Sequence, residues 1–76
     1  MPFVQVRLCE GAFSREQHRQ LIADITDAFV KMGGEAVRPS VTVVVDEVAD
    51  GLWGEGGEIL DLEKIRARRK ARERSL

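Results

Sequence analysis

The stretch MPFVQVRL, residues 1–8, opens the chain and predicts its first element. Its apolar side chains Val4, Val6 and Leu8 alternate with Gln5 and Arg7. A period of two is typical of a β-strand that turns one face to a core. Pro2 shares the parity of the valines, so we expect it on the apolar side at the start of this strand.

A helix is predicted next, because Ser14 to Gln17 has the form of a capping box. Apolar residues follow at helical spacing and predict a buried stripe: Leu21, Ile25, Ala28, Phe29 and Met32. Two glycines, Gly33 and Gly34, favour a helix end. His18 lies among polar neighbours, and we expect it to be exposed.

A second strand is predicted over residues 41–46, where Val41, Val43 and Val45 alternate with their neighbours. Residues 35–39 form the connection to it, and Pro39 biases Arg38 towards an extended conformation. A strand, a helix and a strand with short loops predict a β-α-β unit of the α/β (α+β) class, with parallel strands.

The glycine-rich residues 50–59 hold the only tryptophan, Trp53, and predict a short C-terminal hairpin or a folded-over loop. A chain this small covers such a side chain poorly, so Trp53 is expected to pack against a neighbouring subunit or to line a pocket.

The sign of the net charge changes after residue 61. Residues 1–61 carry a net charge of −6 and residues 62–76 a net charge of +5. We therefore expect a folded domain over 1–61 and a basic tail over 62–76, helical or disordered.

Length and composition limit the class of protein. A chain of 76 residues forms one domain with a small core, and its single cysteine, Cys9, allows no internal disulfide. It has no Cys/His cluster for a metal, so oligomerisation is the remaining route to stability.

No signal peptide or membrane span is visible, and a cytoplasmic location is expected. The basic tail lacks interleaved aromatics and follows an acidic body, which does not favour nucleic acid as a partner.

Several segments together resemble the 4-oxalocrotonate tautomerase family. They are residues 1–6, Glu10-Gly11, the helix start at Ser14, residues 43–48 and residues 53–57. The resemblance implies a β-α-β subunit whose sheets join in dimers, and three dimers in a homohexamer. It also implies an enzyme without a cofactor that acts on a small carboxylic acid. Pro2 corresponds to the family's base, and Trp53 to an aromatic residue supplied by a neighbouring subunit.

Pro2 would serve as this base once Met1 is removed, because its nitrogen then becomes a secondary amine. Burial among apolar side chains lowers the pKa of an amine, and a base near neutral pH can move a proton efficiently. We therefore expect a tautomerase, an isomerase that acts on 2-hydroxy- or 2-oxo-unsaturated acids. The alternative for Pro2 is a plain start to an edge strand.

The chain departs from the family in its arginines. It has Ala12 and Thr42 near the positions where members carry them. Arg38 is the replacement we expect to bind substrate, whereas Arg7 and Arg15 are expected at the surface.

Two other functions stay open. Glu55 resembles the water-activating carboxylate of the related trans-3-chloroacrylic acid dehalogenases, so the chain could be a hydratase or dehalogenase. Alternatively, Glu55 is a plain loop residue. The missing arginines also allow an inactive partner subunit in a hetero-oligomer.

Overall fold

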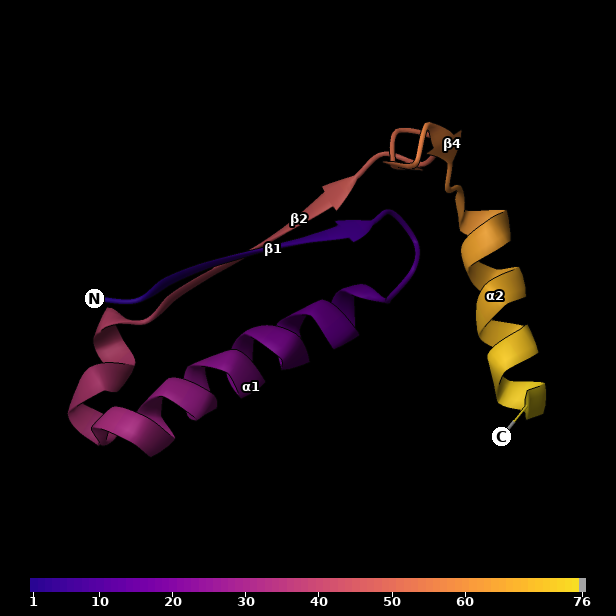
Figure 1. Cartoon of the computed structure of the whole chain (residues 1–76). Helices are drawn as coiled ribbons and strands as arrows, with labels where there is room; N and C mark the ends of the chain where they lie inside the picture. Colours follow the sequence, from indigo (N-terminus) through magenta and orange to yellow (C-terminus); the bar gives the residue numbers. More distant parts are fainter. Residues whose placement is uncertain (76) are drawn as a thin grey trace. The chain divides into compact units, whose positions relative to one another are not determined.

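A computed structural model describes residues 1–75 of the chain. Its elements follow one another along the chain as β1 (Phe3–Cys9), α1 (Arg15–Gly33), η1 (Glu35–Ser40), β2 (Thr42–Val48), β3 (Gly54–Glu55), β4 (Glu58–Ile59) and α2 (Leu62–Ser75) (Figure 1). The chain forms two compact units. The first holds residues 1–7 and 13–46, and the second holds residues 8–12 and the chain from Glu47 onward.

The two long strands, β1 and β2, form one sheet and run parallel. At one end the backbone N–H of Thr42 donates to the carbonyl of Pro2 at 3.0 Å. At the other end the N–H of Glu10 donates to the carbonyl of Val48 at 2.8 Å. With α1 between the strands in sequence, this confirms the predicted β-α-β unit. Strand β2 begins one residue later than predicted and ends two residues later.

Exposure alternates along β1 as the sequence predicts. Phe3, Gln5 and Arg7 are exposed, while Val4, Val6 and Leu8 are half-buried. Pro2 is also half-buried, in the same alternation. The side chains that share the parity of Pro2 therefore form the covered face of the strand.

The predicted start of α1 is confirmed, but its covered face is rotated from the prediction. Ser14 Oγ accepts from the N–H of Gln17 at 3.1 Å, and Gln17 Oε1 accepts from the N–H of Ser14 at 2.8 Å. Met32 was expected on the buried stripe but is 78% exposed, and Ala28 is exposed too. The half-buried positions are His18, Leu21, Ile22, Ile25, Thr26, Phe29 and Val30.

The expectation that His18 is exposed was wrong, because His18 also lies on the covered face of α1. Its ring is half-buried, and its Nε2 is enclosed without a hydrogen-bond partner within the described residues. His18 lies one turn before Ile22, so it belongs to the face that meets the strands. Polar neighbours in sequence did not reveal this, because residues adjacent in a helix point in different directions.

The connection to β2 is a 3₁₀ helix, η1, which contains Pro39. Arg38 therefore lies in a helical turn, and the extended conformation expected of it was wrong. Proline disfavours the α region in the residue before it but does not forbid it, and Arg38 lies in the 3₁₀ turn while its side chain binds Glu35 and Asp27.

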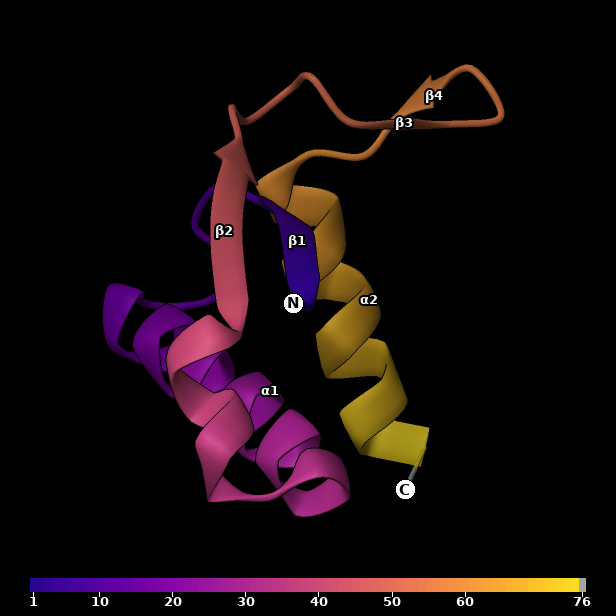
Figure 2. The ribbon, with the colours of Figure 1, turned by 90° about the vertical axis from the view of Figure 1, so that its left-hand side faces the viewer.

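The second unit contains the predicted hairpin. Strands β3 and β4 pair antiparallel, with Gly54 opposite Ile59 and Glu55 opposite Glu58. Gly56 and Gly57 connect them with φ of 60° and 80°, the positive values that a tight two-residue turn needs. Figure 2 shows β3 and β4 folding back on each other before the chain enters α2.

No residue of the described chain is fully buried, and several large apolar side chains are exposed. Phe3 is 65% exposed and Leu52 is 75% exposed. An isolated chain of this length buries little surface.

Candidate active site

Pro2 lies at the point where the chain enters the sheet. Its carbonyl is held by the N–H of Thr42, the first residue of β2. Figure 1 shows the N-terminus beside the passage from η1 into β2. Met1 precedes Pro2 and is fully exposed. Removal of Met1 would therefore leave a secondary amine at a position that the sheet fixes.

Arg38 lies in the same unit and is held by two carboxylates. Its Nη1 donates to Asp27 Oδ1 at 3.0 Å, which ties η1 to α1. Its Nε donates to Glu35 Oε1 at 2.8 Å, and its Nη2 donates to Glu35 Oε2 at 3.3 Å. These hydrogen bonds raise the pKa of Arg38, and the Arg38 guanidinium lowers the pKa of Glu35. Three of the five N–H groups of the guanidinium are thus engaged.

Trp53 and Glu55 lie in the second unit, on the hairpin. Trp53 directly precedes β3 and is half-buried, and its carbonyl accepts from the N–H of Leu60 at 2.7 Å. Glu55 is exposed at the end of β3. The two predicted residues are thus two positions apart, with Trp53 just before β3 and Glu55 at its end.

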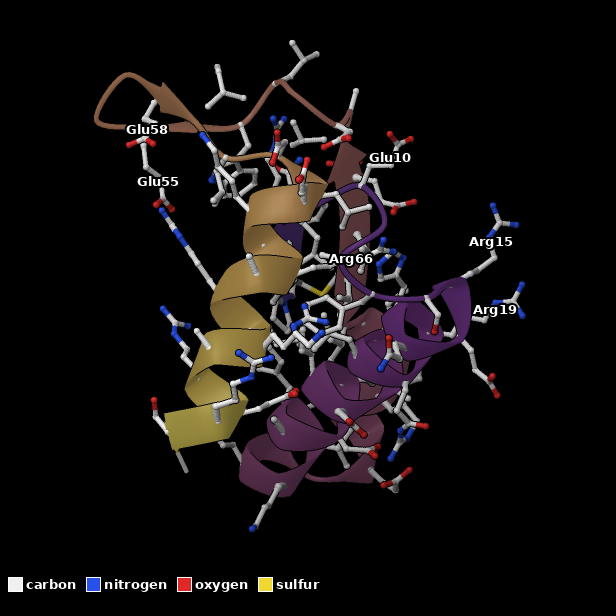
Figure 3. All side chains as sticks on the ribbon, turned by 90° about the vertical axis from the view of Figure 1, so that its right-hand side faces the viewer. Glu10, Arg15, Arg19, Glu55, Glu58 and Arg66 are labelled. Carbon is white, nitrogen blue, oxygen red and sulfur yellow. The ribbon has the colours of Figure 1, made fainter. Side chains whose placement is uncertain are left out.

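The cationic partner of Glu55 was not expected from the sequence. Arg68 of α2 places Nη1 3.3 Å from Glu55 Oε1, and Figure 3 shows the Glu55 carboxylate directed towards α2. Lys64, one turn earlier on the helix, lies 3.5 Å from Glu58 and donates to the carbonyl of Ile59 at 2.8 Å. The hairpin and α2 are therefore joined by two ion pairs.

The start of α2 is fixed by carboxylate acceptors. Asp61 Oδ1 accepts from the N–H of Lys64 at 2.9 Å, and Asp50 Oδ1 accepts from the N–H of Leu62 at 2.8 Å. Both bonds satisfy N–H groups that a helix leaves unpaired in its first turn. Asp61, a residue type favoured directly before a helix, is a local signal that marks this helix start.

Further along α2, Arg69 Nη2 donates to the carbonyl of Ala12 at 3.1 Å. Leu62 packs over Gly11, where a Cβ would lie only 2.9 Å from Leu62 Cδ2. The helix is thus fastened to the loop after β1 as well as to the hairpin, and the sequence pattern did not predict this fastening.

Cys9, at the end of β1, is the single cysteine of the chain. Burial raises the pKa of the Cys9 thiol, and the carboxylates of Asp50 and Glu55 raise it further. A thiol that resists deprotonation is a poor nucleophile. Arg15 and Arg19 extend outward from α1 (Figure 3). Residues 1–75 contain no group of three side chains suited to hold a metal ion, and no helix among them has the length and apolar character to cross a membrane.

Comparison with known proteins identifies the family. The family model described as Tautomerase enzyme matches residues 2–62. The chain belongs to the tautomerase family. It is 44% identical over 59 residues to Probable tautomerase K2 of Dickeya dadantii, which covers 76% of this chain and 85% of that protein. It is 37% identical over 59 residues to a 2-hydroxymuconate tautomerase of Pseudomonas putida, covering 78% and 90% of the two chains.

A solved structure of 4-oxalocrotonate tautomerase isozymes from Methylibium petroleiphilum has the same fold. The match has a TM-score of 0.66 at 31% identity and covers 84% of this chain and 97% of that one. This tautomerase is therefore an enzyme of the isomerase class that acts on small molecules. Because the family model ends at residue 62, nearly all of α2 lies outside the matched range.

Proposed function

We propose that the mature enzyme uses the amine of Pro2 as a general base to tautomerise a small 2-hydroxy- or 2-oxo-unsaturated carboxylic acid. The observation that carries the proposal is the half-buried Pro2 at the fixed entry of the sheet, inside the range matched by the family model. The name of the Pseudomonas putida relative, 2-hydroxymuconate tautomerase, supports this substrate class.

The chemistry needs only one proton and one base. The amine takes the proton of the enol hydroxyl, and the electrons move into the conjugated system to give a dienolate. The protonated amine then returns the proton to a carbon further along the chain, so the product is an isomer of the substrate. A base with a pKa near neutral pH serves both steps, and half-burial lowers the pKa of an amine towards that range.

A cation is needed to hold the carboxylate and to stabilise the negative charge of the dienolate. We assign Arg38 to this role. It is 44% exposed, and two of its N–H groups remain beyond the three that bind Asp27 and Glu35. In the proposed homohexamer, Trp53 of a neighbouring subunit closes an apolar pocket over the substrate.

Hydration chemistry with Glu55 as the water-activating base is less favoured. Arg68 Nη1 lies 3.3 Å from Glu55 Oε1, so this carboxylate is engaged in an ion pair with α2. We therefore assign Glu55 to the fastening of α2, and residues 62–76 to an appendage on a catalytic domain of residues 1–61.

The test combines intact mass with turnover. We expect the purified protein to lack Met1, and to convert 2-hydroxymuconate with a rate that rises with pH through the pKa of the amine. In Pro2→Ala we expect kcat to fall about a hundredfold or more, the range of general-base catalysis. Pro39→Ala, which changes the only other proline, should keep most of its activity at an unchanged assembly state. A retained Met1 in a fully active enzyme would exclude the mechanism.

A further inference from the structure

Helix α2 carries most of the positive charge of the chain. Residues 62–75 contain seven Lys or Arg residues and two Glu residues. Nearly all of this helix follows residue 62, where the match to the family model ends. The matched tautomerase range therefore does not account for these charges.

One side of α2 uses its cations inside the second unit. Lys64 and Arg68, one turn apart, form ion pairs with the hairpin carboxylates of Glu58 and Glu55. Arg69 donates to a backbone carbonyl in the loop after β1. These contacts fasten the helix, and they engage three of its seven cations.

Another side of α2 carries cations that make no such contact. Arg66, Lys70 and Arg74 recur every four residues, so they follow one side of the helix, with neighbours about 6 Å apart along its axis. All three are exposed and have no hydrogen-bond or ion-pair partner within the described residues. Figure 3 shows Arg66 and Glu55 on opposite sides of α2. We name these three cations the basic stripe.

A second copy of the chain offers few unengaged anions to the basic stripe. Residues 1–61 contain eleven Asp or Glu residues, and ten of them already pair with a cation or accept a hydrogen bond. Glu16 is the exception in the part of the chain that the structure describes. The charge of the basic stripe is therefore matched better by a different molecule than by another copy.

The composition of α2 does not suit nucleic acid or a lipid surface. Residues 62–75 have no aromatic side chain on which a base could stack, and Glu63 and Glu73 interrupt the positive charge. Closely spaced phosphates would be repelled by these carboxylates. A lipid surface requires an exposed apolar face, but Leu62 and Ile65 are half-buried and the other apolar residues of the helix are alanines. Discrete carboxylates on a protein fit both the cations and the interruptions.

We propose that the basic stripe of α2 is a docking surface for an acidic segment of another protein, in which carboxylates recur about one helical turn apart. Arginine pairs with a carboxylate through two parallel hydrogen bonds, and lysine pairs with it as a point charge. The basic stripe lies beyond the matched range, so this proposal does not depend on the Pro2 mechanism.

The experiment measures binding of a labelled synthetic peptide, a helical repeat of one Glu and three Ala, to the full-length enzyme by fluorescence anisotropy at low ionic strength. The test variant changes the basic stripe: Arg66→Gln, Lys70→Gln and Arg74→Gln. The control variant removes the same charge from exposed residues of α1: Arg15→Gln, Arg19→Gln and Lys31→Gln.

In the test variant we expect the Kd for the peptide to rise about tenfold, as for the loss of three exposed ion pairs. The control variant should change the Kd by less than about twofold, and added salt should weaken binding to the unaltered enzyme. The melting temperature of the test variant should stay the same, because the basic stripe makes no contact that holds the fold. A charge-reversed variant should instead bind a peptide with Lys in place of Glu: Arg66→Glu, Lys70→Glu and Arg74→Glu.

Equal losses of affinity in the test and control variants would overturn the proposal, because they would reflect net charge and not the basic stripe. Absence of peptide binding to the unaltered enzyme would overturn it as well. So would tighter binding of mixed-sequence RNA, or of phosphatidylserine vesicles, than of the peptide at the same ionic strength. Failure of the Pro2 mechanism is a separate result, because it appears in turnover and leaves peptide binding unaffected.

Discussion

At the scale of single residues, Arg38 has a structural role and a proposed role in binding. It joins η1 to α1 through Asp27 and donates two hydrogen bonds to the Glu35 carboxylate. It is also the cation that we propose to bind the carboxylate of the substrate. Exposed ion pairs contribute little to stability one by one, but a guanidinium shared by two carboxylates fixes geometry. The geometry it fixes is that of the turn leading into Thr42, which binds the carbonyl of Pro2.

The Glu35 pair predicts a pH-dependent stability. The hydrogen bond and charge of Arg38 lower the pKa of Glu35 in the folded state. A carboxyl group with a lowered folded pKa stabilises the fold above its unfolded pKa, and this contribution disappears as pH falls through the folded value. We therefore expect Glu35→Gln to lower the melting temperature at pH 7 and to have a smaller effect at ~pH 3, because a larger share of this carboxyl is protonated there.

The control for this measurement is Glu73→Gln in α2, since Glu73 is exposed and has no ion-pair partner within the described residues. It should leave the melting temperature nearly unchanged at both pH values. A difference between Glu35→Gln and the unaltered protein that is as large at low pH as at neutral pH would contradict the assignment of the effect to the ion pair.

At the scale of elements, the hairpin depends on the backbone of two glycines. Gly57 has φ of 80°, which costs a residue with a Cβ about 1 kcal/mol or more. No atom lies within 4 Å of the place where its Cβ would be, so the cost of Gly57→Ala comes from the backbone alone. We expect this variant to destabilise the hairpin by about 1 kcal/mol, measured by denaturant unfolding with Trp53 fluorescence.

Gly54→Ala is the matched control in the same hairpin. Gly54 does not have a positive φ, and a Cβ there would meet the carbonyl oxygen of Glu58 at an ordinary 3.5 Å. It should change the unfolding free energy by a few tenths of a kcal/mol, about the size of other exposed changes. Equal losses in both variants would show that the positive φ is not the cause.

At the scale of the whole molecule, the described part of the chain has little buried interior. No described residue is fully buried, while Phe3, Met32 and Leu52 are largely exposed. Association that covers such side chains stabilises the fold by mass action. We expect the melting temperature to rise with protein concentration between about 1 and 100 µM, with sedimentation showing oligomers. A melting temperature independent of concentration, together with a monomer in sedimentation, would contradict this expectation.

Local structure and family membership could be predicted from the amino-acid sequence alone. The alternation of residues 3–9, the capping box at Ser14 and the glycine pair of the hairpin act through neighbours in the chain, so their patterns predict the elements directly. The resemblance that Pro2 and the order of motifs support led to the family that the comparisons confirm. The roles of Pro2, Arg38, Trp53 and Glu55 stay predictions.

The covered side of α1 and the partners of the charges on α2 depend on the folded chain. Met32 and His18 were misplaced because a helix pattern shows an apolar stripe but not the sheet against which it packs. Arg38 meets Asp27 across 11 residues, and Arg68 meets Glu55 across 13. Long flexible side chains pair with the charged groups that lie near them in the folded chain. Beyond one helical turn, the spacing in the sequence does not predict which groups lie near.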